Sequence, residues 1–308
     1  MSCTQPIYAL KLGALNPNTG KERIKILPRR IESSYRYWCE EYGEDNILQL
    51  PCGHCESCIE KRARSWAARC VLEAACYEQN CFITLTYSDN CLPSIGLCKK
   101  DVQRFIRKLR DRTGRKIRYF LAGEYGEHTY RPHYHLIIFN YFPQDGKFLK
   151  PSEHGGFLYR SKEISECWDN KGFILVGDVT YASAGYVARY CQKKLAKQGN
   201  TKEFCLMSLR PGIGESFIKQ HLYDVYDTDK VYGKFGKNAF VQPFRYYDKV
   251  FESIDPERFE LVKNVRITNA RLSIAADMLR FGFDNVERLY KYKGVSKSID
   301  FEKLKRRI

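Results

Sequence analysis

The chain has no run of roughly 20 apolar residues, the length that a membrane-spanning helix requires, so we expect no membrane partner. Its first residues carry no signal-peptide pattern, and we find no internal repeat or flexible linker. Acidic residues are also in deficit, because 36 Asp and Glu face 52 Lys and Arg, which gives the 308 residues a formal charge of +16. A polyanionic partner attracts such an excess through phosphate contacts and counterion release. The composition favours a nucleic-acid-binding protein, with a merely basic soluble protein as the alternative.

Disulfides are not expected, although cysteine is abundant. Thirteen cysteines, an odd number, lie in a chain without an export signal, which predicts reduced thiols in a cytosolic compartment. Cys52, Cys55 and Cys58 have the spacing of metal-binding thiolates, and a fourth ligand would complete a tetrahedral zinc site. Cys3, Cys39 and, less comfortably, His54 are available as that ligand. An iron–sulfur cluster and unligated thiols at a helix start are the alternatives.

Hydrophobic periodicity predicts an α+β fold. The expected elements are helices at 58–77 and from Lys99 to a stop at Gly114, and strands at 81–87, 117–124, 133–139 and 173–180. This order indicates an antiparallel sheet of about five strands, covered by helices on one face. We divide the chain into an N-terminal segment at 1–60 with the cysteines, a core at 61–215 and a basic helical region at 216–308 that contacts DNA or a partner.

Two histidines open one of these strands, in the order Arg131-Pro132-His133-Tyr134-His135. Residues separated by one position on a strand point to the same face, so His133 and His135 can share one divalent cation. Glu124 ends the preceding strand and would lie beside them if the hairpin pairs it with His133. Two imidazoles and a carboxylate suit Mg²⁺ or Mn²⁺ acting as a Lewis acid. The alternative is a hydrogen-bonded histidine pair, with Glu124 in a salt bridge to Arg118 or Arg131.

Two tyrosines, Tyr186 and Tyr190, are four residues apart, so a helix that starts just after Gly185 would present both hydroxyl groups on one face. Tyrosines at this spacing usually serve packing. Lys193, on the same face, and the adjacent Lys194 favour phosphoryl transfer instead, because an ammonium stabilises a phenolate and a developing phosphorane charge. The chemistry would be a transesterification that leaves a 5′-phosphotyrosine and a free 3′-hydroxyl.

These residues resemble the motifs of the HUH endonucleases, the family of rolling-circle replication initiators and relaxases. The resemblance rests on Phe82–Tyr87, on Arg131–His135 and on the two-tyrosine segment Tyr186–Lys193. It is strongest to the replication initiators of small single-stranded DNA phages, the Microviridae and their gokushovirus branch. There it also includes Pro51–Cys58, Gly123–Gly126 and Met207–Gly214, and it covers roughly residues 1–215.

The resemblance implies a palm-like Rep-type nuclease that nicks the replicative-form DNA at the plus-strand origin, in the cytoplasm of a bacterial host. It implies that host polymerase, and with it host helicase, are partners. The implied catalytic residues are Tyr186, Tyr190 and Lys193, and the implied metal ligands are His133, His135 and Glu124. The resemblance also favours Cys3 as the fourth zinc ligand. We further expect DNA contacts from Thr84, Thr86, Arg131, Arg189 and Lys194.

Two other functions are compatible with parts of this pattern. A non-enzymatic, zinc-containing nucleic-acid-binding protein would explain the charge and the cysteines but not the histidine pair or the tyrosines. A two-histidine phosphodiesterase would need a second His-x-Thr/Ser motif, which does not occur among the six histidines.

Overall fold

The chain forms two compact units in the computed structural model. The structure describes residues 3–17, 20, 22–28, 35–126, 129–152, 156–191 and 201–282. Unit 1 is drawn from residues 1–61 and 269–308, and unit 2 from residues 62–268. The three-segment division made from the sequence stays a prediction beside these two units.

Unit 1 contains a small antiparallel sheet. Its strands, in the order β2-β1-β3, are β1 (Ile7–Leu15), β2 (Glu22–Ile26) and β3 (Ile47–Leu50). Helix α1 (Tyr35–Tyr42) and a short 3₁₀ turn, Glu44–Asn46, precede β3. The core is small, with Leu27, Trp38 and Ile47 buried together.

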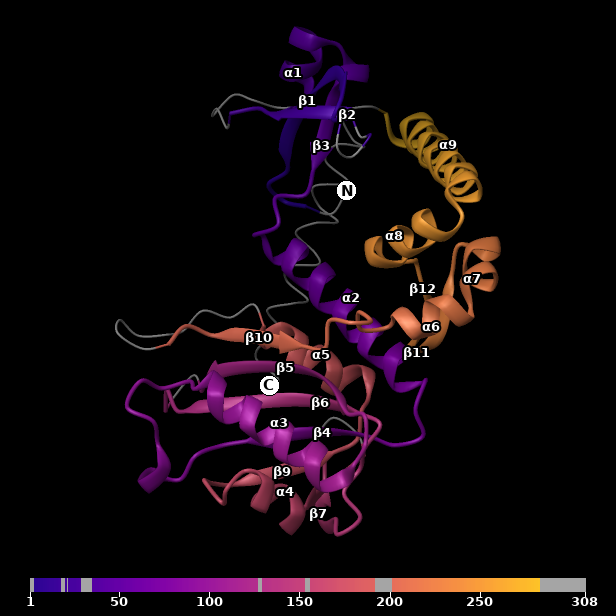
Figure 1. Ribbon diagram of the computed structural model, residues 1–308. Helices are drawn as coiled ribbons and strands as arrows, with labels where there is room; N and C mark the ends of the chain where they lie inside the picture. The colour runs from indigo at the N-terminus through magenta and orange to yellow at the C-terminus, as the bar shows by residue number, and fades with distance from the viewer. Residues whose placement is uncertain are drawn as a thin grey trace. The chain divides into compact units, whose positions relative to one another are not determined.

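Unit 2 is organised around a seven-stranded antiparallel sheet (Figure 1). Its strand order is β10-β5-β6-β4-β9-β8-β7. The strands are β4 (Asn80–Leu85), β5 (Arg118–Tyr125), β6 (Pro132–Phe139), β7 (Lys147–Pro151), β8 (Phe157–Arg160), β9 (Ile174–Gly177) and β10 (Phe204–Met207). The α+β class is confirmed, and the strand number exceeds the expected five because β7, β8 and β10 are short and carry little periodicity.

Helices cover both faces of this sheet, so the expectation that they cover one face is wrong. Helices α3 (Lys99–Thr113) and α4 (Lys162–Cys167) pack on one face, whereas α2 (Glu56–Ala74) and α5 (Tyr181–Tyr190) pack on the other. The physical reason lies in β5 and β6, which are apolar on both sides. A strand that is apolar throughout its length needs cover on both faces.

Sequence signals placed α3 well. Its stripe of Val102, Phe105, Ile106 and Leu109 is buried, as the periodicity predicts. The helix ends at Gly114, whose φ of 63° is left-handed and whose N–H donates to the carbonyl of Arg110. Glycine adopts this conformation without steric cost, which explains the stop.

A buried ion pair fixes the loop that follows β10. The Nε of Arg118 on β5 lies 2.5 Å from Oε1 of Glu73 on α2, and the Glu73 side chain is fully buried. Arg118 also donates to the carbonyl of Pro211 at 2.7 Å, and the N–H of Gly214 donates to the other Glu73 oxygen at 2.7 Å. Arg69 donates twice to the carbonyl of Ile213. The loop is thereby attached to a helix and a strand by charged groups.

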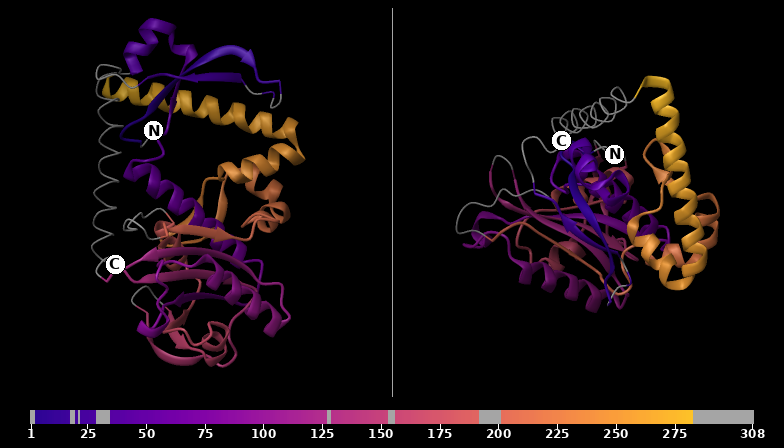
Figure 2. Two further views of the ribbon diagram at one scale, coloured as in Figure 1. Left: turned by 60° about the vertical axis from the view of Figure 1, so that its left-hand side comes forward. Right: turned by 90° about the horizontal axis from the view of Figure 1, so that it is seen from above.

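The rest of unit 2 packs against α2 in a third core cluster. Its elements are α6 (Glu215–Gln220), α7 (Leu222–Thr228), β11 (Val231–Phe235), β12 (Asn238–Val241) and α8 (Arg245–Ile254). Helix α9 (Pro256–Phe281) follows as one long helix (Figure 2). The expected helical character beyond about residue 250 is confirmed as far as Phe281, and the basic end, 303–308, lies outside the described residues. No helix in the described ranges has the length and hydropathy of a membrane span.

Candidate active site

Three central strands bring the predicted metal ligands to one face of the sheet. Glu124 lies opposite His133 in the β5–β6 pairing, so the register assumed from the sequence is confirmed. His135 lies opposite Ala122 on β5 and opposite Thr84 on β4. Cross-strand partners share a face, so these side chains gather on the side covered by α5.

His135 is held at both ring nitrogens. Its Nε2 lies 2.9 Å from Oε1 of Glu124, and its Nδ1 lies 3.1 Å from Oγ1 of Thr84. His135 is 5% exposed and Glu124 is 4% exposed. These contacts fix the plane of the imidazole ring, as supporting hydrogen bonds do for metal-binding histidines.

His133 lies further out on the same face. Its ring is nearly parallel to that of His135, with 6.4 Å between the ring centroids. Burial lowers the pKa of His133, and the neighbouring His135 lowers it further. A lowered pKa keeps the imidazole neutral, which is the form that binds a cation.

The alternative salt bridges for Glu124 do not account for its position. Arg118 pairs with Glu73, as described above, and Arg131 lies 2.5 Å from Oδ1 of Asp89. Imidazole and carboxylate donors fit Mg²⁺ or Mn²⁺ chemically. The donor atoms of His133, His135 and Glu124 are not all within 4.8 Å of one another, since the described ranges contain one such group and it is made of cysteines. The role of these three residues as ligands stays a prediction.

The tyrosine helix packs directly on this histidine face. The ring of Tyr186 lies 4.8 Å from that of His135, the ring of Tyr190 lies 5.3 Å from it, and the two tyrosine rings are 4.4 Å apart. Tyr190 is 9% exposed. Burial raises the pKa of Tyr186, and Tyr190 raises it further. The strand with the histidines and the helix with the tyrosines are therefore in contact.

Helix α5 begins earlier than the sequence indicated. Thr180 is its N-cap and forms a reciprocal capping box with Ser183, so the helix starts at Tyr181. Gly185 lies inside the helix, and its expected position before the first turn is wrong. The cap outweighs the helix-weakening effect of a central glycine.

The comparisons with known proteins agree with this arrangement. A family model for the replication-associated protein ORF2 matches residues 80–195, which run from β4 past the end of α5. The chain is 34% identical to "Replication-associated protein VP4" of Bdellovibrio phage phiMH2K over 68% of this chain and 70% of that protein. The chain belongs to this family of phage replication-associated proteins.

Two further family members are similar. "Replication-associated protein ORF2" of Spiroplasma virus 4 is 33% identical over 69% of this chain and 70% of that protein. "Replication-associated protein ORF4" of Chlamydia phage 1 is 34% identical over 47% of this chain and 38% of that protein. No solved structure matches. The expected kinship with replication proteins of small phages is confirmed.

The residues expected to contact DNA have other contacts in this family member. Thr84 holds His135, Thr86 donates to the carbonyl of Phe173 at 2.8 Å, and Arg131 donates to the carbonyl of Tyr87 at 2.7 Å besides pairing with Asp89. Arg189 is half-buried on α5. Lys193 and Lys194 lie outside the described residues. Their roles in DNA binding or catalysis stay predictions.

Phe82 is a site residue that the sequence analysis did not assign. Its ring lies parallel to that of His135 at 6.0 Å and edge-on to that of Tyr186 at 6.2 Å. Phe82 precedes Thr84 by two positions on β4, so strand alternation would have placed it on the same face. It supports the imidazole ring from the side.

The cysteine cluster of unit 1 could bind zinc. The sulfur atoms of Cys3, Cys52, Cys55 and Cys58 all lie within 4.8 Å of one another, which is the geometry of a tetrahedral site. Cys39 and His54 are not in this group, so Cys3 is the fourth candidate ligand, as the resemblance favoured.

Backbone groups support this cluster. The N–H groups of His54 and Cys55 donate to Sγ of Cys52 at 3.4 and 3.3 Å. Burial opposes ionisation of Cys55, but hydrogen bonds from Thr4 outweigh it and lower its pKa to about 6. Burial raises the pKa of Cys58 to about 12, and its neighbours Cys55 and Cys3 contribute to the rise. Cys55 is thus the thiol most ready to bind a metal, because the thiolate is the ligand.

Proposed function

We propose that this replication-associated protein is a metal-dependent endonuclease and strand transferase that nicks single-stranded origin DNA. The product would be a covalent 5′-phosphotyrosine, and the free 3′-hydroxyl would start rolling-circle replication of a phage genome. The observation that carries the proposal is the 4.8 Å between the rings of His135 and Tyr186. Family membership supports it independently.

The residues divide the chemistry among them. His133, His135 and Glu124 would hold Mg²⁺ or Mn²⁺, which polarises the scissile phosphate when bound. Thr84 and Phe82 keep the His135 ring in place. A tyrosine oxygen forms the new bond to phosphorus, the bond from phosphorus to the 3′ oxygen breaks, and the tyrosine proton ends on that leaving oxygen. The phosphodiester is conserved, so the ends can be rejoined without ATP.

Two tyrosines on one helix face permit two successive transfers. One of them would hold the first DNA end while the other cuts again, and their 4.4 Å ring separation gives both access to the same phosphate. We propose Lys193 as the group that stabilises the developing negative charge. The reaction would take place in the host cytoplasm, with host helicase and polymerase extending the 3′ end.

A tyrosine double variant tests this proposal. The wild-type protein, incubated with single-stranded origin DNA and Mn²⁺, should give a tyrosine-linked oligonucleotide by mass spectrometry. The Tyr186→Phe/Tyr190→Phe variant should give none while binding the DNA normally. Tyr181→Phe is the matched control, because Tyr181 lies on the same helix but packs against Phe235. Cleavage by the double variant would show that the tyrosine assignment is wrong.

The metal ligands are tested separately. His133→Ala and His135→Ala should each abolish Mn²⁺-dependent cleavage and leave DNA binding intact. The second candidate function is a non-enzymatic nucleic-acid-binding protein, which the four clustered cysteines favour. Wild-type protein that binds origin DNA tightly but never forms an adduct, with either metal, would favour that function.

A further inference from the structure

The face of the sheet that carries the histidines extends toward the β7 edge. Leu175 on β9 lies opposite Thr84, and Lys147 on β7 lies opposite Arg160 on β8. The β8–β9 register pairs Tyr159 with Val176 and therefore places Arg160 beside Leu175. One row of side chains thus crosses the sheet from His135 to Lys147. Neighbouring strands are about 4.8 Å apart, so Arg160 is three strands, or about 14 Å, from His135.

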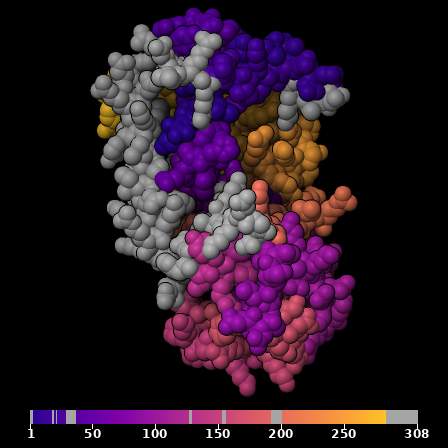
Figure 3. All heavy atoms as spheres, turned by 90° about the vertical axis from the view of Figure 1, so that its left-hand side faces the viewer, coloured from indigo at the N-terminus to yellow at the C-terminus, as the bar shows by residue number. Residues whose placement is uncertain are grey.

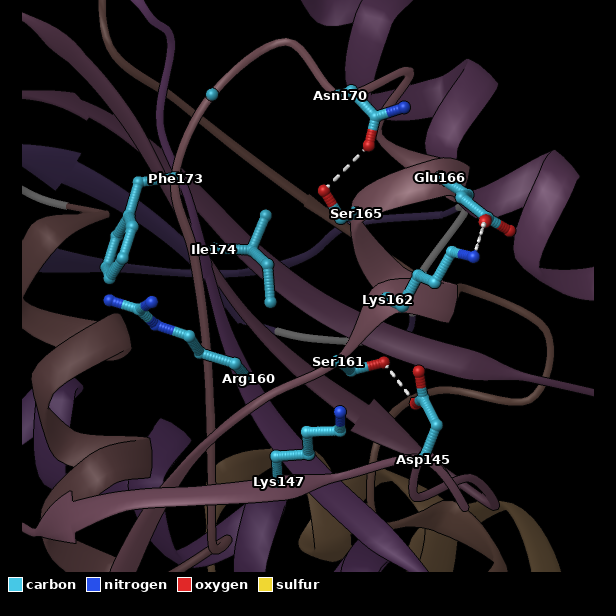
Figure 4. A pocket seen from close by; sticks show the side chains of 11 residues that line it. Asp145, Lys147, Arg160, Ser161, Lys162, Ser165, Glu166, Asn170, Phe173 and Ile174 are labelled. Atoms are coloured by element: carbon cyan, nitrogen blue, oxygen red, sulfur yellow. Dashed lines mark hydrogen bonds and ion pairs between the residues drawn. The ribbon is translucent and has the colours of Figure 1, made fainter.

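An open pocket lies at the far end of this row. It has a volume of about 560 Å³, and its lining includes Lys147, Arg160 and Phe173 (Figure 4). The guanidinium of Arg160 lies 5.1 Å from the centre of the Phe173 ring, which is 46% exposed. The carbonyl of Phe173 accepts hydrogen bonds from the N–H and the hydroxyl of Thr86, at the end of β4. Phe173 is thus tied to the strand that supports His135.

The acidic side chains of this pocket are neutralised locally. Asp145 accepts hydrogen bonds from Ser161 at 2.6 Å and from the N–H of Glu163 at 2.9 Å. Glu166 pairs with Arg112 at 2.7 Å and with Lys162 at 3.7 Å. Within the described part of the chain, Lys147 and Arg160 form no ion pair, although both are exposed. The pocket therefore offers two available positive charges beside an exposed aromatic ring.

We propose that this pocket binds single-stranded DNA flanking the phosphate that is cleaved, with a base stacked on Phe173 and phosphates on Arg160 and Lys147. The inference rests on the proposed function, which places that phosphate at His135. Aromatic rings with basic neighbours are the usual means of holding single strands without reading their sequence. The shared row of side chains gives one strand a continuous course from the pocket to the histidines. The elements concerned form one closely packed body within unit 2 (Figure 3).

Matched variants test the pocket. Phe173→Ala removes the ring, and its control is Phe157→Ala, because Phe157 is 51% exposed and lies on the opposite face of the same sheet edge. Lys147→Ala/Arg160→Ala removes two charges, and its control is Arg245→Ala/Lys249→Ala on α8.

Binding is measured without metal, so that no cleavage occurs. The probe is a fluorescent oligothymidylate of about 20 nucleotides, longer than a typical single-strand site. Phe173→Ala should weaken binding about tenfold, as the loss of one stacked base does. The basic pair should reduce the slope of log affinity against log salt by about 1.4, or about 0.7 for each phosphate contact. Each control should stay within about twofold of wild type.

Three results would overturn the inference. Phe173→Ala binding like wild type is one, an equal loss in Phe157→Ala is another, and a salt slope as altered in the α8 pair as in the pocket pair is the third. If Phe173→Ala does not fold, Phe173→Leu keeps the apolar bulk without the aromatic face and should show the same loss. A wild-type protein that forms no tyrosine adduct but shows these losses would refute the proposed function and leave the pocket as a DNA site.

Discussion

The buried ion pair between Glu73 and Arg118 should be the most sensitive point of unit 2. Glu73→Gln keeps the shape of the side chain but leaves the Arg118 guanidinium, 6% exposed, without its counter-charge. Breaking a buried pair in this way costs about 3–5 kcal/mol. The variant also weakens the attachment of the loop at Pro211 and Gly214, since both take part in the same network. We therefore expect a large loss of stability from one atom pair.

The loss can be measured as a shift in melting temperature. For a unit of about 200 residues, each kcal/mol moves Tm by about 2–4 °C, so Glu73→Gln should lower Tm by about 6–20 °C. Tryptophan fluorescence reports unit 2 alone in a Trp38→Phe background, because Trp66 and Trp168 both belong to that unit.

Glu78→Gln is the matched control for this experiment. Glu78 is exposed, just beyond α2, and its substitution should change Tm by less than about 2 °C. A Glu73→Gln shift no larger than that of the control would refute the reasoning, because it would mean that the buried charge is not held by its partner.

Three further results are expected. Thr84→Val removes the hydroxyl that holds His135 and should weaken Mn²⁺ binding about tenfold in a calorimetric titration, whereas Thr86→Val should not. Hydrogen bonds from Lys219 and then Tyr246 lower the pKa of Glu215 from 4.5 to about 2, so its stabilisation is present above pH 4.5 and is lost as the pH falls toward 2. Wild type should lose about 1–2 kcal/mol more than Glu215→Gln across that window in urea unfolding, because Lys219 is half exposed. Cys55→Ser should remove bound zinc, measured by elemental analysis, whereas Cys91→Ser, outside the cluster, should retain it.

Each of these expectations has a contradicting outcome. Equal Mn²⁺ affinity in Thr84→Val and wild type would mean that the hydroxyl does not position the imidazole. Parallel pH profiles for Glu215→Gln and wild type would show that the carboxylate is not stabilised by folding. Wild-type protein that contains no zinc after purification with the metal would reject the cysteine site altogether.

Local periodicity was sufficient to predict the centre of unit 2. The alternation of His133 and His135 and the turn between β5 and β6 predicted both the face and the register, because one-residue slips would move apolar side chains such as Ile137 into water. The periodicity of α3 and its stop at Gly114 were equally clear. These features depend on neighbours in the sequence.

Features set by distant contacts were harder to predict. The second helical layer depends on α2, whose alanines Ala63 and Ala67 meet the sheet face across a long sequence separation. The start of α5 depends on the Thr180–Ser183 capping box, a weaker signal than the glycine that drew attention. Cys3 joins its three partners from about 50 residues away, so only the family resemblance singled it out.

The burial of His135 and Tyr190 has a consequence for how a substrate arrives. A DNA backbone cannot reach an imidazole and a phenol that are almost closed to solvent, so some element must give way first. Strand β6 is hydrogen-bonded on both sides, by β5 and β4, whereas α5 rests on the sheet through side chains alone. Opening should therefore come from the helix, and amide protons in its last turn should exchange with solvent sooner than those of the strand beneath.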